Sequence, residues 1–144
     1  MHQIKESKDY ERLTYFWAEN GLEIEAGVPR SEHVLNCWEY LDGEGRLIGA
    51  AALEKRAGEF VVADLAVDSA CRGTGLGTAF MEIIEAEIIS LGGKSAWLVG
   101  MAPDFYLKLG WKAVAREQAP NISKCFTCPK FGGECRPEIM CKSF

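Results

Sequence analysis

The chain has 144 residues, of which 48% are hydrophobic and 26% charged, and its formal net charge at pH 7 is −5. These values are typical of one globular domain, 1–144, that is long enough to bury a hydrophobic core. The acidic balance disfavours nucleic acid as a partner, and no apolar run approaches the ~20 residues of a membrane span. Because the N-terminus lacks the apolar stretch of a secretory signal, we expect a cytoplasmic protein.

The first third of the chain predicts a short strand, one amphipathic helix and a loop. The strand is expected at residues 1–5, and Ser7 is placed to cap the helix that follows. Apolar side chains then recur at helical spacing, namely Tyr10, Leu13, Phe16 and Trp17. Gly21 ends this helix, and residues 22–33 show no clear periodicity, so they form a loop or a short second helix.

Three strands separated by tight turns follow. They are predicted at residues 34–41, 46–55 and 59–67. Turns this short imply an antiparallel meander. The third strand is apolar on both faces, which predicts a central strand that is covered on both sides.

The segment Arg72-Gly73-Thr74-Gly75-Leu76-Gly77 directly follows the third strand and opens a helix over residues 76–91. A glycine-rich turn at a helix start leaves backbone N–H groups unpaired, and the helix dipole adds positive charge there, so the turn predicts a phosphate site. The turn lacks the Gly-Lys-Ser/Thr ending of nucleoside-triphosphate loops and does not fit the Gly-x-Gly-x-x-Gly dinucleotide pattern. From these residues alone, an ordinary glycine-rich loop is an equally good interpretation. The helix is expected to bury one face, formed by Leu76, Phe80, Ile84, Ile88 and Leu91.

The last third predicts a strand at residues 95–99, parallel to the third strand because a helix crosses between them. Pro103 begins a short helix that Gly110 ends, and Trp111 can pack back on its last turn as the next strand begins. A final strand is expected at residues 138–144.

Two of these segments resemble the GNAT N-acetyltransferase superfamily. The pattern Arg-x-x-Gly-x-Gly after a strand is similar to its motif A, whose turn holds the pyrophosphate of acetyl-CoA, and Phe105-Tyr106-Leu107-Lys108-Leu109-Gly110-Trp111 resembles its downstream helix-and-strand signature. The resemblance implies an α/β (α+β) fold with a mixed, mostly antiparallel sheet of six to seven strands, about four helices and a splayed parallel strand pair. It also implies an acyltransferase that moves acetyl from acetyl-CoA to a small-molecule amine acceptor by direct attack. Homodimers are common in this superfamily.

The resemblance further implies a coenzyme site. Its backbone groups would come from the turn, with Thr78 at the helix start and the end of the third strand facing the pantetheine arm; these residues are Leu65, Ala66, Val67, Arg72, Gly73, Thr74, Gly75, Leu76, Gly77 and Thr78. Arg72 would either contact phosphate or brace the loop. From the sequence alone, residues 65–67 are simply core.

Two side chains are candidates for catalysis. Tyr106 lies at the position of a tyrosine that often stabilises or protonates the leaving thiolate in the family; the alternative is a packing aromatic. Asp64 is the candidate general base, because a carboxylate in an apolar strand has a raised pKa and can accept the amine proton; its alternative role is a structural hydrogen bond. Glu59 is a weaker candidate base, and Val99 stands where many relatives carry asparagine.

Four of the six cysteines, Cys125, Cys128, Cys135 and Cys141, cluster near the C-terminus. Their number suits tetrahedral zinc, although only one pair has the usual short spacing.

The segment from Cys125 also resembles the tail of short N-acetylglutamate synthases, which implies an amino-acid acceptor such as glutamate, with Arg30 or Arg116 as carboxylate clamps. Two other functions stay open at this point: a CoA-binding sensor without turnover, and a metal-dependent interaction module.

Overall fold

The structure is a computed structural model that describes residues 3–22, 24–100, 102–120, 122 and 138–144. A seven-stranded sheet has the order β1-β2-β3-β4-β5-β7-β6, and only the β4–β5 pairing among the described strands is parallel. The strands are β1 (Lys5–Glu6), β2 (Val34–Leu41), β3 (Leu47–Arg56), β4 (Glu59–Val67), β5 (Ser95–Gly100), β6 (Lys112–Ala113) and β7 (Glu138–Ser143). The helices described are α1 (Tyr10–Glu19), α2 (Leu76–Ser90), α3 (Pro103–Lys108) and the 3-10 turns η1 (Ser69–Cys71) and η2 (Arg116–Gln118). The mixed α/β fold predicted from the sequence is therefore confirmed.

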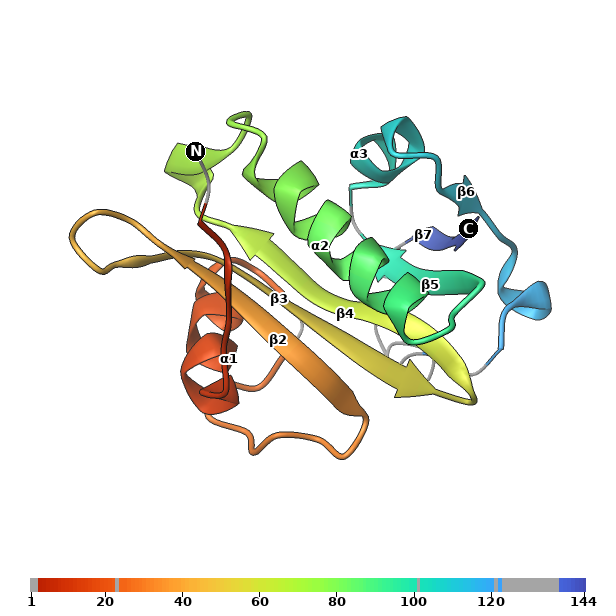
Figure 1. Ribbon diagram of the computed structural model, residues 1–144, viewed down its shortest axis with the longest axis horizontal. Helices are drawn as coiled ribbons and strands as arrows, with labels where there is room; N and C mark the ends of the chain where they lie inside the picture. The colour runs from red at the N-terminus through yellow and green to blue at the C-terminus, as the bar shows by residue number, and fades with distance from the viewer. Residues whose placement is uncertain (1–2, 23, 101, 121, 123–137) are drawn as a thin grey trace.

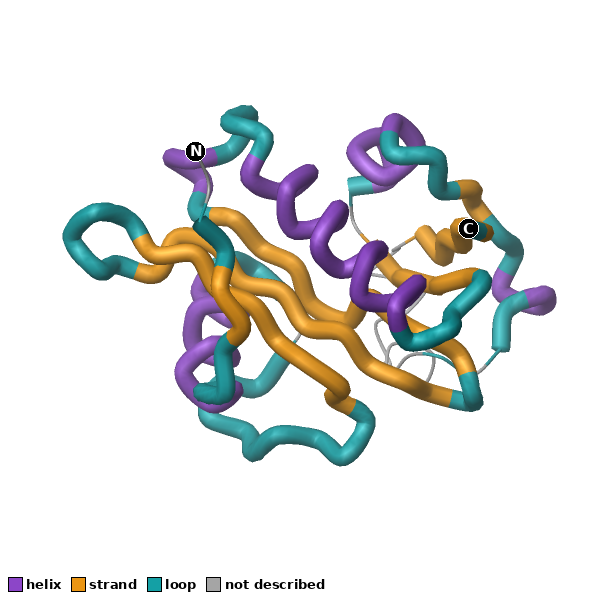
Figure 2. Tube along the Cα trace, viewed as in Figure 1, coloured by secondary structure: helices purple, strands orange, loops and turns teal. Residues whose placement is uncertain are grey.

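Helices α1 and α2 cover opposite faces of the sheet, as Figure 1 and the tube in Figure 2 show. On the α2 face, Phe80 and Ile84 pack against Leu53 and Val62 in one buried cluster. On the α1 face, Leu13 and Trp17 belong to a second cluster with the small side chains of β3. Strand β4 contributes to both clusters, so the prediction of a central strand covered on both sides is confirmed.

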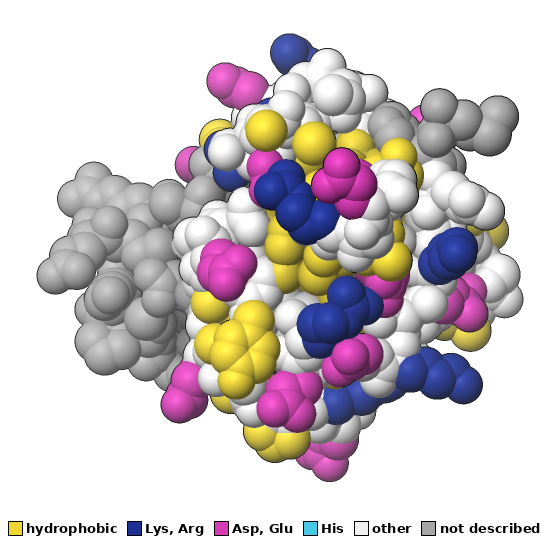
Figure 3. All heavy atoms as spheres, turned by 90° about the vertical axis from the view of Figure 1, so that its left-hand side faces the viewer, with side chains coloured by type: hydrophobic (Ala, Val, Ile, Leu, Met, Phe, Trp, Pro, Cys, Tyr) yellow, Lys and Arg dark blue, Asp and Glu magenta, His cyan; other side chains and the backbone are white. Residues whose placement is uncertain are grey.

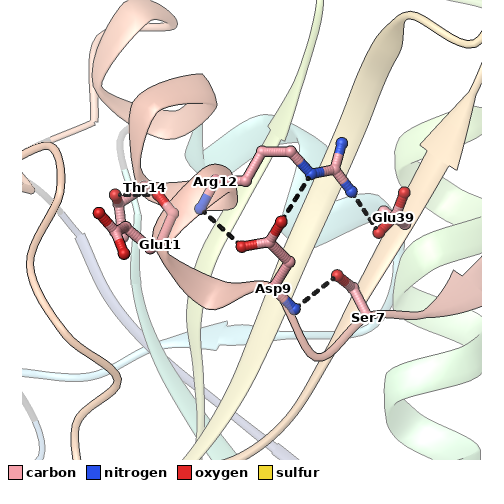
Figure 4. Close-up of polar contacts among 6 residues, drawn as sticks. All are labelled: Ser7, Asp9, Glu11, Arg12, Thr14 and Glu39. Atoms are coloured by element: carbon pink, nitrogen blue, oxygen red, sulfur yellow. Dashed lines mark hydrogen bonds and ion pairs between the residues drawn. The ribbon is translucent and has the colours of Figure 1, made fainter.

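The start of α1 differs from the sequence prediction. The N-cap is Asp9, whose Oδ1 accepts a hydrogen bond from the Arg12 N–H at 3.3 Å, and not Ser7. Ser7 still belongs to the sheet edge, because its N–H donates to the Cys37 carbonyl at 2.8 Å. Figure 4 shows that Arg12 also bridges Asp9 and Glu39, with an N–O distance of 2.7 Å to Glu39, and so ties the helix start to β2.

The end of α2 also differs. Leu91 was expected on the buried face, but its side chain is 54% exposed. The helix ends at Ser90, and Gly92, with φ of +83°, turns the chain toward β5. Leu91 therefore lies beyond the last residue to which the helical period applies.

Strands β4 and β5 pair only at one end. Their register runs from Phe60↔Ala96 to Val62↔Leu98, although β4 continues to Val67. Beyond Val62, in the described part of the chain, the β5 side of β4 has no strand partner, while β7 stays paired with β5 as far as Gly100. The expected splayed parallel pair is confirmed, and it opens the sheet at its centre.

The surface carries mixed charge. On the face in Figure 3, acidic and basic side chains are interspersed around a patch of hydrophobic ones, and the described residues form no continuous basic surface there of the kind that nucleic-acid binding needs. No helix in the described ranges is long and apolar enough to cross a bilayer.

Candidate active site

A cleft of about 1150 Å³ lies where β4 and β5 separate. Tyr10 and Val28 line it from the α1 side, whereas Gly77, Phe105 and Tyr106 line it from the side of α2 and α3. Because α1 and α2 cover opposite faces of the sheet, the cleft passes through the gap between the two strands. A molecule entering from one face can therefore meet a molecule entering from the other.

The glycine-rich turn forms one end of this cleft. Gly73 and Gly75 have φ of +80° and +86°, a backbone region that residues with a side chain rarely adopt. A Cβ at Gly73 would meet no described atom within 4 Å, so the space before the turn is open. The first helical bond of α2 runs from the Ala79 N–H to the Gly75 carbonyl, which leaves the N–H groups of residues 76–78 without helical acceptors.

The other contacts of the turn hold it in shape. The Arg72 N–H donates to the Ser69 carbonyl at 3.4 Å, and its guanidinium Nε donates to the Val67 carbonyl at 3.4 Å. The Thr74 hydroxyl donates to the Cys71 carbonyl at 2.6 Å. The Arg72 side chain thus braces the turn against the end of β4, and the backbone N–H of Arg72 is already bonded to Ser69.

Eight of the ten residues expected to hold the coenzyme line the cleft: Leu65, Ala66, Val67, Arg72, Gly73, Gly75, Gly77 and Thr78. The two others do not, because the Thr74 hydroxyl is turned to Cys71 and the Leu76 side chain is buried in the core. Val99, at the position where relatives carry asparagine, lines the cleft, whereas Glu59 does not.

Tyr106 is fixed in the cleft wall by the end of α3. The Trp111 N–H donates to the Tyr106 carbonyl and the Gly110 N–H to the Leu107 carbonyl, both at 3.1 Å, which is the Schellman pattern of a helix end. Gly110 has φ of +93°, and the Trp111 ring lies 6.4 Å from the Tyr106 ring, so the predicted packing of Trp111 on this helix is confirmed. Gly100 leaves room for the tyrosine, since a Cβ there would lie 2.8 Å from Tyr106 Cε2.

Burial raises the pKa of Tyr106 to about 12. The phenol is therefore protonated throughout the neutral range and can donate a hydrogen bond to a group inside the cleft. Desolvation by burial is the cause of this shift.

We expect the protein to lose stability as the pH rises through the range from about 9 to about 12. The pKa of Tyr106 is raised from 10.0 to about 12 and that of Cys37 from 9.0 to about 11, both first by burial. Each raised pKa contributes stability that is complete below the unfolded-state value and is lost as the pH passes through the folded-state value. Urea unfolding at pH 8 to 11.5 checks this, with Tyr106→Phe expected to flatten the decline; a midpoint that does not change up to pH 11.5 would contradict it.

On the α1 face, two buried carboxylates lie side by side at the other end of the cleft. Asp64 is opposite Ala52 on β3, and Glu54 follows Ala52 on the same face of that strand. Both line the cleft and are less than a tenth exposed. The Arg56 guanidinium lies 2.6 Å from the Glu54 carboxylate. Tyr10 lines the same wall, and its pKa is raised first by burial and then by the negative charges of Asp64 and Glu54.

Sequence reasoning identified Asp64 and missed Glu54. Glu54 stands near the end of a strand and before a Lys-Arg pair, so its charge favoured a solvent-facing position. The alternation Ala50, Ala52, Glu54 was the available signal, because it places Glu54 on the same buried face as the two alanines.

The loop after α1 covers this end of the cleft and is tied to the helix by one buried hydroxyl. Leu22, Ile24 and Val28 of this loop line the cleft. The Thr14 Oγ1, which is inaccessible to solvent, accepts the Gly27 N–H at 2.8 Å and donates to the Glu11 carbonyl.

Replacing Thr14 with Val is expected to cost about 1 to 3 kcal/mol of unfolding free energy, because the Gly27 N–H loses its acceptor. If the loop shapes a substrate pocket, the KM for that substrate rises while the affinity for a ligand at the glycine turn is unchanged. Urea unfolding checks the loss of unfolding free energy, and calorimetry checks the affinities at the pocket and at the glycine turn. Thr74→Val, on the turn itself, is the control, and equal effects of both variants on the two affinities would contradict the assignment of the loop.

The predicted zinc site falls mostly outside the described residues, since Cys125, Cys128 and Cys135 all lie there. Cys141 is on β7, half-buried, opposite Trp97. Within the ranges that are described, no three His, Cys, Asp or Glu side chains are grouped to hold a metal ion.

The two arginines proposed as carboxylate clamps do not line the cleft. Arg30 Nη2 donates to the carbonyls of Val34 and Leu35, at 3.2 Å each, and so fastens the loop to the start of β2. Arg116 belongs to the exposed turn η2.

Comparison with known proteins agrees with this architecture. The family model "acetyltransferase (GNAT) domain" matches residues 33–113, and no curated protein matches the sequence. Similar solved structures include an acetyltransferase from Streptococcus agalactiae, with 15% identity, a TM-score of 0.75 and coverage of 99% of this chain and 98% of that one. The ribosomal-protein-S18-alanine N-acetyltransferase from Escherichia coli is 18% identical, with a TM-score of 0.71 and coverage of 99% and 94%.

A third similar structure is the N-acetylglutamate synthase from Neisseria gonorrhoeae, complexed with coenzyme A and N-acetyl-glutamate. It is 18% identical, with a TM-score of 0.70, and the match covers 99% of this chain but 35% of that one. Identities this low show a shared fold, whereas the family model spans more than half of the sequence. The chain therefore belongs to the GNAT family of acetyltransferases and is an acyltransferase.

Proposed function

We propose that this acyltransferase transfers acetyl from acetyl-CoA directly to an amine. The observation that supports this best is that a single cleft joins the glycine-rich turn, the unpaired side of β4 and Tyr106 with two carboxylates on the opposite face of the sheet. The arrangement offers separate entrances for two substrates and one meeting point between them.

On the α2 side, the N–H groups of the turn suit the diphosphate of the coenzyme, because the start of α2 adds partial positive charge. The amides of the pantetheine arm can pair with the backbone of Leu65, Ala66 and Val67, which has no strand partner on that side among the described residues. This path leads the thioester into the gap beside Tyr106.

The chemistry then needs two proton-handling groups. The amine nitrogen attacks the thioester carbon, the new C–N bond forms, and the C–S bond breaks to release CoA. Tyr106 donates a hydrogen bond to the sulfur as negative charge develops there, and Asp64 takes the proton that the amine loses. Holding both substrates in one cleft supplies the remaining rate enhancement by orientation.

We propose an amine as the acceptor. An amino acid such as glutamate is one candidate, from the resemblance of the C-terminal segment and from the N-acetyl-glutamate bound in the Neisseria gonorrhoeae structure. Neither Arg30 nor Arg116 lines the cleft, so neither is placed to bind the carboxylate of such an acceptor there.

A thiol-release assay with acetyl-CoA and a panel of amines tests the proposal, together with calorimetry of coenzyme binding. We expect CoA release that depends on the added amine, with one N-acetylated product per CoA. Tight coenzyme binding without release in the presence of any amine would instead identify a coenzyme sensor. Absence of coenzyme binding would exclude both.

A further inference from the structure

Arg56 faces the acceptor pocket, our name for the end of the cleft that Tyr10, Glu54, Arg56 and Asp64 line on the α1 side. It is the last residue of β3 and follows Glu54 on the strand face that α1 covers. Its Nε donates to the Glu54 carboxylate at 2.6 Å, and its side chain is 23% exposed. Neither Nη1 nor Nη2 donates to any residue that the structure describes. The pair with Glu54 therefore fixes the guanidinium and leaves its other N–H groups for a ligand.

The Tyr10 hydroxyl is a second donor in the acceptor pocket. The residue is 6% exposed, and its ring packs edge-on against Trp17, with ring centroids 5.6 Å apart. No hydrogen bond joins the hydroxyl to the described part of the chain. Among the described residues, the only side-chain nitrogen or oxygen that is both fully enclosed and unbonded is Trp111 Nε1, so the Tyr10 hydroxyl keeps access to the cleft. Because buried polar groups are nearly always hydrogen-bonded, a ligand is the expected partner of this hydroxyl.

Arg56 and Tyr10 act at the same end of the cleft. Burial raises the pKa of Tyr10 first, and the charges of Asp64 and Glu54 raise it further. Arg56 acts on the same pKa in the opposite direction, so its charge reaches the hydroxyl. The phenol stays protonated at neutral pH and is a donor, as the guanidinium is. An oxygen on the ligand is the group that accepts hydrogen bonds from both.

The position of this oxygen relative to the amine follows from strand geometry. Asp64, the proposed base, is opposite Ala52, and Glu54, which holds the guanidinium, is two residues further along β3. At 3.3 Å per residue, this separation is about 7 Å. Two hydrogen bonds of about 2.9 Å each take up most of it. The oxygen therefore belongs to the group attached directly to the carbon that bears the amine.

We propose that Arg56 and Tyr10 select acceptors that carry an oxygen beside the amine, as in an α-amino carboxylate or an α-amino amide. The inference rests on the proposed function and narrows its substrate class. The Arg56 Nη groups and the Tyr10 hydroxyl donate to that oxygen, while Asp64 receives the proton that the amine loses. An amine without the oxygen leaves both donors unbonded in the pocket, which lowers its affinity.

Leucine, leucinamide and isoamylamine form a matched set of probes. All three carry the same aliphatic group, which suits the Leu22, Ile24 and Val28 side chains of the wall, and they differ only in having a carboxylate, a carboxamide or a hydrogen beside the amine. We expect calorimetry on the CoA-loaded protein to show that leucine or leucinamide binds about tenfold or more tightly than isoamylamine. The tighter of the two identifies the oxygen as that of a carboxylate or of an amide.

Tyr10→Phe and Arg56→Lys test the source of this preference. Phe keeps the ring that packs on Trp17, and Lys keeps a cation beside Glu54 but lacks the planar fork of N–H donors. Each variant should lower the preference over isoamylamine about fivefold or more, with the CoA affinity unchanged. Tyr10→Phe should lose no unfolding free energy in urea, because no described residue accepts its hydroxyl proton.

Tyr15→Phe and Arg12→Lys are the matched controls. Tyr15 lies on the same helix as Tyr10, and Arg12 is also paired with a strand glutamate, Glu39, at 2.7 Å. Neither Tyr15 nor Arg12 lines the cleft, so both variants should keep the preference of the parent.

The outcomes separate the inference from the proposed function. A preference for leucine or leucinamide that Tyr10→Phe and Arg56→Lys both reduce, without thiol release from any amine, supports the inference and contradicts catalysis. Thiol release with isoamylamine favoured or equal supports catalysis and overturns the inference. A preference that neither variant changes, or no binding of any probe, also overturns the inference.

Discussion

Replacing Tyr106 with Phe is expected to lower kcat by about a hundredfold or more, with the affinity for CoA changed by less than about twofold. The phenol is buried in the cleft wall, its pKa of about 12 keeps it protonated, and it is the group proposed to stabilise the departing sulfur. Phe keeps the ring that packs on Phe105 and Trp111, so the wall should keep its shape. Steady-state thiol release and calorimetry measure the two quantities.

Tyr40→Phe is the matched control for this variant. Tyr40 is a half-buried tyrosine on β2 that does not line the cleft, so its loss of a hydroxyl should leave kcat within about twofold of the parent. If Tyr106→Phe keeps more than about a third of the parent kcat, Tyr106 is only a packing aromatic and the leaving group is stabilised by another donor.

Replacing Gly73 with Ala is expected to weaken CoA binding by about tenfold to a hundredfold. The residue has φ of +80° and lines the cleft, so a methyl group both strains the turn and stands where the diphosphate would approach. Loss of one hydrogen bond to a charged group costs about 1.5 to 3 kcal/mol, which corresponds to this range. Calorimetric titration with CoA measures the effect.

Gly45→Ala separates backbone strain from loss of the ligand site. Gly45 has φ of +82°, a Cβ there would also meet no described atom within 4 Å, and it lies in the β2–β3 turn away from the cleft. Both variants should lose about 1 to 2 kcal/mol of unfolding free energy, because each forces a side chain into the left-handed region. Only Gly73→Ala should affect CoA binding; equal CoA affinity in the two variants would place the diphosphate elsewhere.

The elements that the sequence predicted best are those specified by local chemistry. Gly110 was expected to end the short helix and Trp111 to pack back on it, and both follow from a backbone motif that involves only neighbouring residues. The start of α1 was predicted less well, because Ser7 and Asp9 are both good caps and the choice depends on the bond from Ser7 to Cys37, which is distant in sequence.

The parts of the cleft that were not predicted depend on long-range pairing. Residues 95–99 gave no sign that β7, the last strand, would pair between β5 and β6. Glu54 was missed because its importance comes from lying beside Asp64 across a strand pair with an irregular register between Ala52 and Leu53. The splayed strand pair came only from the resemblance to a known superfamily, since β4 is mostly apolar both where it pairs with β5 and where it does not.

A crystal structure of the protein with CoA bound tests most directly whether the cleft through the sheet is a coenzyme site. We expect the diphosphate oxygens to lie about 2.7 to 3.2 Å from backbone N–H groups of the glycine-rich turn, and the sulfur to lie in the gap between β4 and β5 beside the Tyr106 hydroxyl. A coenzyme bound outside this gap, or an empty cleft at saturating CoA, would contradict it.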